Sequence, residues 1–256
     1  MKKKTMISKN NQTHPESGNV LFLILIAVAL FAALSYAVTS SSRSGGGDAN
    51  EETNLISSST VTQYPASVRT SIIRMQVTDG VSTSELEFNA PVDFANCGTY
   101  GGVLGANCVF HPDGGQATYV PGSADVMTSG NQTNWIFSSN NEVNLVGRTA
   151  GGNAAAGNTA EVIAFLIGIR EGVCSRINEE LGIAGIPTEA SIELTTAMVN
   201  ADGTVPGGVP GITADAAGGD DGTIGEGAAA ALDGQAFGCF QQPAGTYIYY
   251  HVLLEQ

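Results

Sequence analysis

VLFLILIAVALFAALSYAV, from Val20 to Val38, is a stretch of nineteen residues without a charge, and the interpretation of the whole chain starts from it. As a helix rising about 1.5 Å per residue it would be about 28 Å long, close to the ~30 Å hydrocarbon thickness of a bilayer. All lysines of the chain precede it, at Lys2, Lys3, Lys4 and Lys9. Because positive charges favour the cytoplasmic side of a membrane, this pattern predicts one transmembrane segment with its N-terminus in the cytoplasm.

Changes of composition divide the chain into four expected parts. Residues 1–18 are typical of a targeting leader, and residues 19–43 of an apolar transmembrane or assembly helix. Residues 44–52 are expected to be a linker, because three successive glycines from Gly45 disfavour a continuous helix. Residues 53–256 can bury a core of their own and are expected to form one acidic α+β domain outside the cytoplasm.

The expected domain is strongly acidic. From Gly45 onward the chain has 23 acidic residues, which is the total of 24 less Glu16, against five arginines, so its formal net charge is −18. A surface of this sign repels the phosphates of nucleic acids and of anionic lipids. The composition therefore argues against a nucleic-acid partner.

The start of the domain has the periodicity of an amphipathic helix. Apolar residues recur there at spacings of three and four, on one helical face: Val61, Tyr64, Val68, Ile72 and Met75. Pro65 lies inside this stripe, so a start, kink or break of the helix is expected there. The stripe is predicted to pack on a β-sheet.

The strands are predicted from apolar runs and turn residues. Residues 134–139 and 142–147 are expected to pair as a hairpin, with Asn140 and Asn141 as its turn. Residues 161–169 are the most apolar strand of the chain. These runs predict a small antiparallel sheet.

The last part of the chain is expected to contain a helix, a long loop and a final strand, in that order. Residues 171–181 have helical spacing and a stop at Gly182. Residues 200–236 are rich in glycine and are expected to be a mobile loop. Residues 246–254 are expected to be a closing strand in the middle of the sheet. The predicted fold is thus α+β, with a long hydrophobic-then-amphipathic helix packed on the sheet; residues 91–130 are expected to be mostly loop.

Four cysteines in the part predicted to lie in an oxidising compartment favour two disulfides. They are Cys97, Cys108, Cys174 and Cys239. Three pairings are possible, and the most local one joins Cys97 to Cys108 and leaves Cys174 with Cys239. Four buried free thiols are the alternative.

The chain offers few residues for catalysis. Its three histidines are His14 in the leader, His111 in a loop near Asp113, and His251 in the last expected strand. No nucleophile elbow, zinc-protease motif, phosphate-binding loop or C-x-x-C pair is present. We therefore expect no enzyme activity and a turn or surface role for His111.

The aromatic residues are expected to pack in the core. Tyr247, Tyr249 and Tyr250 lie in the expected closing strand, where alternate side chains face the core. Trp135 lies in the first strand of the expected hairpin and is also expected in the core.

The glycine-rich loop suggests a metal site. Asp220, Asp221 and Glu226, joined by Asp215 or Asp202, offer the oxygen ligands that Ca²⁺ prefers. Their spacing is not that of an EF-hand, and such acidic runs are commonly only solvated. Calcium at this loop is one hypothesis, and no other cofactor is expected.

The order of leader, apolar helix, amphipathic helix and disulfide-bearing domain resembles that of type IV pilins and pseudopilins. The resemblance covers roughly residues 1–80 and rests on Gly18 as the last leader residue, Asn19 as the mature N-terminus, and the segment from Val20 to Val38. It implies a pilin-like fold, cleavage after Gly18 by a prepilin peptidase, and packing of the apolar segment against other pilin-like subunits. It also implies a single-pass location in inner-membrane lipid, with the domain in the periplasm or, in a filament, outside the cell. The apolar segment is also similar to that of exported proteins of Gram-negative bacteria.

Two positions depart from the pattern of this family. Pilins usually have Phe or Met at the first mature position, where this chain has Asn19, and Glu at the fifth, where this chain has Leu23. In the family the Glu carboxylate is thought to meet the N-terminal amine of a neighbouring subunit. A chain without it is similar to minor pseudopilins at a filament tip.

Three functions are therefore open. The first is a pilin-like structural subunit, and the second is a single-pass anchored binding or adhesion module that does not polymerise. The third is a secreted protein cleaved after Ala37, because Ser35 and Ala37 are small residues of the kind that signal peptidase requires. The mature chain would start at Asn19, near the uncleaved N-terminus, or at Val38, respectively.

Overall fold

The computed structural model describes residues 17–147, 161–189, 192–195, 211–214 and 223–255. The chain divides into two compact units, Met1–Asn50 and Glu51–Gln256. The first contains the apolar part of helix α1, and the second contains the rest of that helix together with all the strands. The chain is α+β, as the sequence predicts.

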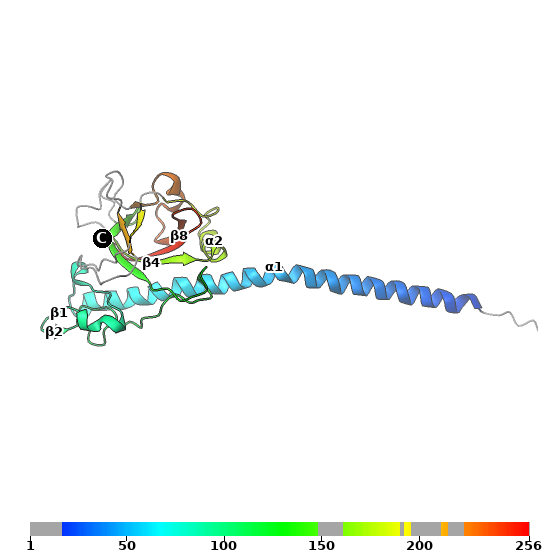
Figure 1. Ribbon diagram of the computed structural model, residues 1–256, viewed down its shortest axis with the longest axis horizontal. Coiled ribbons are helices and arrows are strands. Elements are labelled where there is room, and N and C mark those ends of the chain that lie inside the picture. Colours follow the sequence, from blue (N-terminus) through cyan, green and yellow to red (C-terminus); the bar gives the residue numbers. More distant parts are fainter. Residues whose placement is uncertain (1–16, 148–160, 190–191, 196–210, 215–222, 256) are drawn as a thin grey trace, which may run out of the picture. The chain divides into compact units, whose positions relative to one another are not determined.

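The described elements are coloured along the chain in Figure 1. In order they are α1 (Ser17–Thr78), β1 (Thr99–Tyr100), β2 (Val103–Leu104), β3 (Ile136–Val143), β4 (Glu161–Ile169), α2 (Glu171–Glu180), β5 (Ile192–Thr195), β6 (Gly211–Ala214), β7 (Thr223–Ile224), β8 (Phe237–Gln241) and β9 (Tyr247–Leu254). Short 3-10 helices lie at Thr83–Glu85, Pro91–Asn96 and Gly227–Leu232.

Helix α1 is continuous through the glycine triplet and through Pro65. The predicted break at Gly45, Gly46 and Gly47 is therefore wrong, and so is a start or break at Pro65. A glycine costs a helix only about 1 kcal/mol relative to alanine. Propagating an existing helix is easier than starting one, so the long helical runs on both sides offset this cost.

The predicted apolar stripe of α1 is confirmed. Val68, Ile72 and Met75 are fully buried and Val61 is nearly so, while Tyr64 is partly buried against the same cluster. This burial explains why the helix continues at Pro65. The proline is itself buried, and the packed residues on either side hold the backbone in place although the ring removes one amide donor.

The main sheet has five strands in the order β7-β3-β4-β9-β8. Strands β3, β4, β9 and β8 pair antiparallel, whereas β7 pairs parallel with β3. The prediction of a purely antiparallel sheet is thus wrong at one edge. The chain reaches β7 through a long crossover rather than a tight turn, which is the connection that a parallel pair requires. The prediction that the closing strand lies inside the sheet is confirmed by β9.

The hairpin predicted around Asn140 and Asn141 is wrong. Both asparagines lie in the single strand β3, which pairs with β4 from Ile136 to Asn141. The register shifts between Ser138 and Asn141, so Asn140 lies in a bulge instead of a turn, and Asn141 pairs with Glu161 of β4. The bulge takes up the extra residue without reversing the chain, and the long-range pairing with β4 overrides the local turn signal.

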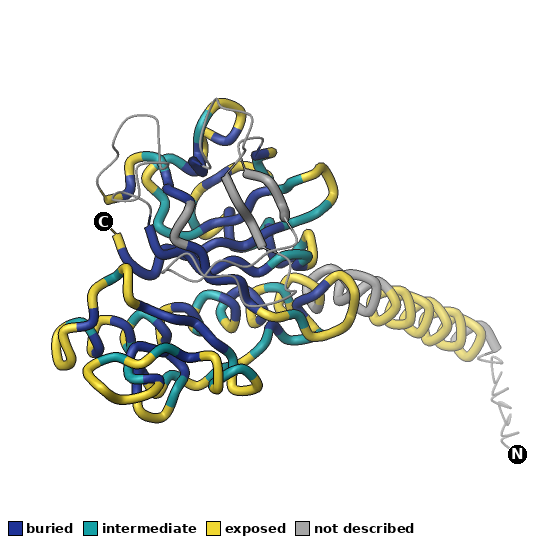
Figure 2. Tube along the Cα trace, turned by 60° about the vertical axis from the view of Figure 1, so that its left-hand side comes forward, coloured by how far each residue is buried: buried dark blue, intermediate teal, exposed yellow. Residues whose placement is uncertain are grey.

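Both faces of the main sheet are covered, so most residues of β4 and β9 belong to the buried class that Figure 2 colours dark blue. On one face the stripe of α1 and helix α2 pack with Ala164 and Leu166 of β4. On the other face Ile224 and Leu232 pack with Phe165, the alternate residue of the same strand. All but the first residue of β9 is therefore buried.

The prediction of one long loop at residues 200–236 is wrong in the parts of this range that the structure describes. Strand β6, strand β7 and the 3-10 helix Gly227–Leu232 lie within it. Ile224, Ala229 and Leu232 are buried in the core, so glycine and alanine content misled the prediction. Residues 200–210 and 215–222 lie outside the described residues.

Candidate functional site

One helix of the described chain is long and apolar enough to cross a membrane. It covers Val20–Thr39, and no residue in it is buried within its unit. Leu30 and Leu34 share one face of the helix and Phe31 lies on another, and all three are 64–73% exposed. A helix in water would present polar residues on its exposed faces. The segment thus has the length and composition of a membrane span, which a signal sequence near the N-terminus also has.

The predicted processing site lies at the beginning of this helix. Gly18 and Asn19 fall inside α1, one and two residues after its first residue, Ser17. Leu23, which stands where the pilin family usually has Glu, is 58% exposed.

The most local disulfide pairing is confirmed. Cys97 is bonded to Cys108 and Cys174 to Cys239, so the described chain has no free cysteine. The second bond joins helix α2 to strand β8. All four residues are buried, which makes both bonds part of the core.

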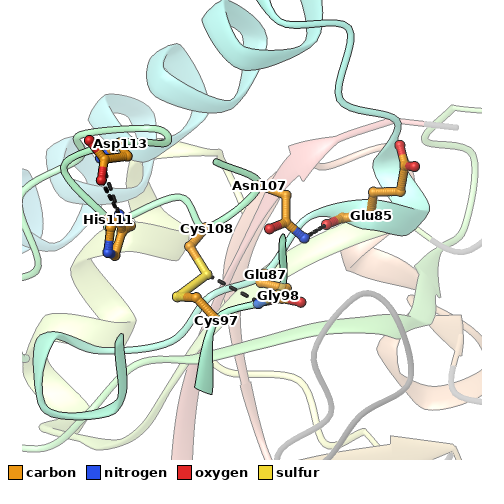
Figure 3. The surroundings of a disulfide bond; sticks show 8 residues. All are labelled: Glu85, Glu87, Cys97, Gly98, Asn107, Cys108, His111 and Asp113. Atoms are coloured by element: carbon orange, nitrogen blue, oxygen red, sulfur yellow. Dashed lines mark hydrogen bonds and ion pairs between the residues drawn. A yellow bond between two sulfur atoms is a disulfide. The ribbon is translucent and has the colours of Figure 1, made fainter. Parts of the chain in front are cut away.

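Glu87 lies against the first disulfide, as Figure 3 shows. Its Oε2 accepts a hydrogen bond of 2.7 Å from the amide of Gly98 and lies 3.1 Å from Cys108 Sγ. A Cβ atom at Gly98 would be 2.6 Å from Glu87 Oε1, so a larger residue there would require the Glu87 carboxylate to shift. The backbone of Glu87 also pairs with Asn107 and Val109. The predicted loop is thus a compact, closed structure.

Glu87, Cys97 and Cys108 place potential metal-ligand atoms within 4.8 Å of one another. The two sulfur atoms are bonded to each other, however, and metals bind the thiolate form of cysteine. In the oxidised chain this cluster therefore organises the loop and does not offer a thiolate ligand.

His111 belongs to a turn beside this loop (Figure 3). Its Nδ1 accepts a hydrogen bond of 3.1 Å from the amide of Asp113 and lies 3.8 Å from the carboxylate of the same residue. The ring packs on Phe94 with 4.8 Å between ring centroids. These contacts are those of a structural turn residue, as the sequence predicts.

The buried aromatic residues pack as predicted. Tyr249 and Tyr250 are fully buried on opposite faces of the sheet, and Trp135 lies 5.1 Å from the ring of Tyr64. His251 Nδ1 and Tyr249 Oη are 2.7 Å apart. Burial, with the charge of Arg69 as a smaller cause, lowers the pKa of His251 to about 4, so this histidine is neutral near pH 7.

Of the residues in the calcium hypothesis, only Glu226 lies among the described residues. Glu226 directly precedes the 3-10 helix Gly227–Leu232, and its side chain is half-buried. Asp202, Asp215, Asp220 and Asp221 lie outside the described residues. The hypothesis is therefore untested.

Sequence reasoning missed two buried carboxylates at one corner of the main sheet. Glu142 and Glu161 are each only 1% exposed. Glu142 Oε1 accepts a hydrogen bond of 3.1 Å from Thr223 Oγ1, and Glu161 Oε2 accepts one of 2.9 Å from the amide of Val143. The sequence did contain a signal for their burial, because each of these acidic residues lies within a run of residues that is predicted to be a strand.

A small cavity of about 70 Å³ lies between α1 and residues 120–126. Its wall is mainly apolar and includes Val61, Tyr64, Trp135 and Leu166. This volume accommodates only a few heavy atoms, well below the several hundred Å³ of a typical ligand site.

No family model, curated protein or solved structure matches this chain.

Proposed function

We propose that the chain is a pilin-like structural subunit, a minor pilin or pseudopilin, of a type IV filament or secretion pseudopilus, and that it has no catalytic activity. The observation that carries this proposal is helix α1. In one helix, an exposed apolar segment at Val20–Thr39 is followed by a stripe buried on a disulfide-bonded α+β domain. This is the order of elements in which the sequence resembles pilins.

The apolar segment would first lie in the inner membrane and then pack against other pilin-like subunits. Lipid tails are as apolar as leucine, so helices associate in a membrane through close packing of small residues rather than through the hydrophobic effect. Ala29, Ala33 and Ala37 recur every four residues and share one helical face. This face is suited to such an approach, and a prepilin peptidase would act before it, after Gly18.

Leu23 favours a minor or tip subunit over a repeating major one. A carboxylate inside an apolar filament core is stabilised only if a charged partner faces it. With Leu23 this chain places no such charge in the apolar segment. The chain therefore needs no matched amine from a neighbour, and it also gains no specific bond to one.

The same residue supports a second candidate function, a single-pass anchored binding or adhesion module that does not polymerise. Leu23 and Asn19 both remove features that assembly uses in pilins. In this case the apolar segment would contact lipid alone, and the acidic domain would act outside the cytoplasm.

The mature N-terminus tests the proposal. The full chain is expressed with a prepilin peptidase, and the first residue of the membrane-bound product is determined by mass spectrometry. We expect Asn19 in the wild type and in the leader control Ser8→Ala, and the uncleaved form in Gly18→Glu. A start at Met1 in the wild type would favour the anchored module, and a start at Val38 a secreted protein; both contradict the proposal.

Crosslinking separates assembly from simple anchoring. Ala33→Cys places a thiol on the small-residue face, and Phe31→Cys places one on nearly the opposite face. In a pilus or pseudopilus, oxidation of membranes should join Ala33→Cys chains to a neighbouring subunit carrying the equivalent cysteine, and Phe31→Cys chains much less. Equal, weak crosslinking at both positions would favour a monomeric anchor.

A further inference from the structure

The loop that the first disulfide closes brings together three side chains of the kind that bind metals. One ligand atom from each of Glu87, Cys97 and Cys108 lies within 4.8 Å of the other two. The three residues are buried, with exposed fractions of 7%, 4% and 0%. In the oxidised chain the two sulfur atoms are bonded to each other. Cleavage of this bond would make both of them available as ligands.

Backbone hydrogen bonds hold this cluster together independently of the disulfide. The backbone of Glu87 pairs with the residues on either side of Cys108. Glu87 Oε2 accepts a bond of 2.7 Å from the amide of Gly98, the residue after Cys97. The carbonyl of Gly98 in turn accepts a bond of 2.8 Å from the amide of Gly105. Because none of these bonds involves a sulfur atom, we expect the three side chains to stay close together in the reduced chain.

The spacing of the three side chains suits a small ion with tetrahedral coordination. Zinc with Zn–S bonds of about 2.3 Å and a Zn–O bond of about 2.1 Å places two sulfur ligands about 3.8 Å apart, and a sulfur and an oxygen about 3.6 Å apart. Glu87 Oε2 already lies 3.1 Å from Cys108 Sγ. The Cα atoms of Cys97 and Cys108 are 6.1 Å apart, so a rotation of the side chains can separate the sulfur atoms while the backbone stays in place.

We propose that the reduced chain binds one zinc ion through the thiolates of Cys97 and Cys108 and the carboxylate of Glu87. A dithiol reductant supplies two electrons and two protons, so that the S–S bond opens to two thiols while the reductant becomes a disulfide. Zinc binding then releases the two thiol protons to the solvent. In the reverse reaction the oxidised reductant takes back two electrons and two protons, the disulfide forms again and the ion is freed. The redox state of the loop thus controls the site.

The ligand set favours zinc over other ions. Calcium and magnesium prefer oxygen ligands alone, whereas zinc takes both thiolate and carboxylate ligands. Two thiolates and a carboxylate are three negative charges in a buried cluster, and without a cation they repel one another. A divalent ion offsets most of this charge, so the thiols become good ligands only when the ion is bound.

Asn107 is a second sign that this cluster has room for a further polar partner. Its Nδ2 donates a hydrogen bond of 2.6 Å to the carbonyl of Glu85, which turns its Oδ1 away from that group (Figure 3). The Oδ1 is buried without a hydrogen-bond partner among the described residues. The side chain is close to the cluster, because a Cβ atom at Gly98 would be 2.6 Å from Glu87 Oε1 and 3.6 Å from Asn107 Nδ2. Zinc with three protein ligands keeps a fourth position for water, and Asn107 offers an acceptor beside it.

Zinc titration of the full chain in detergent tests the site, which goes beyond the proposed function and does not depend on assembly. The chain is reduced with a phosphine, which becomes its oxide with oxygen from water and leaves no competing thiol. We expect one zinc ion per reduced chain and none bound by the oxidised chain. Cobalt(II) in place of zinc should show the visible absorption of a tetrahedral ion and a thiolate-to-metal band in the near ultraviolet.

Variants assign the ligands. Glu87→Gln and the double variant Cys97→Ser, Cys108→Ser should each weaken zinc binding by roughly tenfold or more. Glu85→Gln replaces an exposed acid two residues before Glu87 and is the matched control, so it should bind as the wild type does.

Four results would overturn the proposal: no saturable zinc binding by the reduced wild type, unchanged binding by Glu87→Gln, unchanged binding by Cys97→Ser, Cys108→Ser, or loss of binding only in Cys174→Ser, Cys239→Ser. If a variant fails to fold, the wild type decides. Zinc should raise the melting temperature of the reduced chain and leave that of the oxidised chain unchanged. An equal effect on both chains, or a reduced chain that stays unfolded with zinc present, would contradict the site.

Discussion

Two parts of helix α1 have similar apolar residues but opposite environments. Residues 20–39 are apolar on every face and exposed throughout, whereas residues 61–75 are apolar on one face and bury that face in the domain. Ile72 is fully buried and its neighbour Ile73 is 43% exposed. The periodicity of apolar residues therefore separates a helix whose own domain covers it from one that needs an external apolar phase.

The first prediction tests whether the domain can be destabilised without an effect on the apolar segment. Replacing Cys174 and Cys239 together by alanine opens a loop of 65 residues and should cost about 4 kcal/mol of unfolding free energy. The matched pair Cys97 and Cys108 closes a loop of 11 residues and should cost about 3 kcal/mol. Urea unfolding measures both. Membrane retention should not change, and a parallel loss of retention would contradict the independence of the two parts.

The second prediction compares neighbouring residues of the amphipathic part. Ile72→Ala creates a cavity in the core and should lower the unfolding free energy by about 3.5 kcal/mol. Ile73→Ala removes a partly exposed side chain and should lower it by less than about 1 kcal/mol. Thermal and urea unfolding give both values. Equal losses would mean that the buried face of α1 is assigned incorrectly.

The third prediction concerns the apolar part. Leu30→Arg puts a charge near the centre of the segment and should oppose membrane insertion by about 3 kcal/mol. The melting temperature of the domain should stay the same, because Leu30 belongs to the other compact unit. Extraction of membranes with alkaline carbonate measures retention, with Leu30→Val as the control. A drop in the domain's melting temperature would show that the segment supports the fold.

The smallest expected effect is the pH dependence of the domain in metal-free buffer. Burial raises the pKa of Glu161 to about 7, so the folded state holds this proton more tightly than the unfolded state does. The Glu161 contribution to stability is full below the unfolded pKa, near 4.5, and is lost as the pH rises to about 7. His251 acts in the opposite direction: its pKa is lowered to about 4, so its contribution is lost as the pH falls from about 6.5.

The two effects are separated by comparing the wild type with Glu161→Gln. The stability gained by this substitution should increase between pH 4.5 and pH 7 and then stay constant, as measured by urea midpoints at successive pH values. A pH-independent difference would show that Glu161 does not titrate in this range.

The elements with a clear period were predictable from the sequence. Strand β4 and helix α2 lie within one residue of their predicted ends, and the stripe of α1 is buried as its spacing of three and four requires. The local disulfide pairing was also correct. In each case the prediction needs only residues that are close together in the sequence, because the feature depends on a short hydrophobic repeat or closes a short loop.

The failures have one physical cause, which is that long-range pairing overrides local signals. Asn140 and Asn141 have the composition of a turn but are held in β3 by β4. Residues 223–224 are surrounded by glycine and yet form a strand beside β3. The burial of Glu142 and Glu161 was missed for the same reason, because it depends on the pairing of β3 with β4 and β7.

The position of β9 between β4 and β8 has a consequence for how the protein is made. Ile163 and Val252 are partners in the sheet but stand 89 positions apart in the chain. A ribosome that adds ~5–20 residues per second would expose β4 for roughly 4–18 s before its partner exists. During that interval an apolar strand has an unpaired edge, which is the kind of segment that aggregates. Slow synthesis or a shortage of chaperones should therefore lower the yield of this protein more than that of a domain built from hairpins.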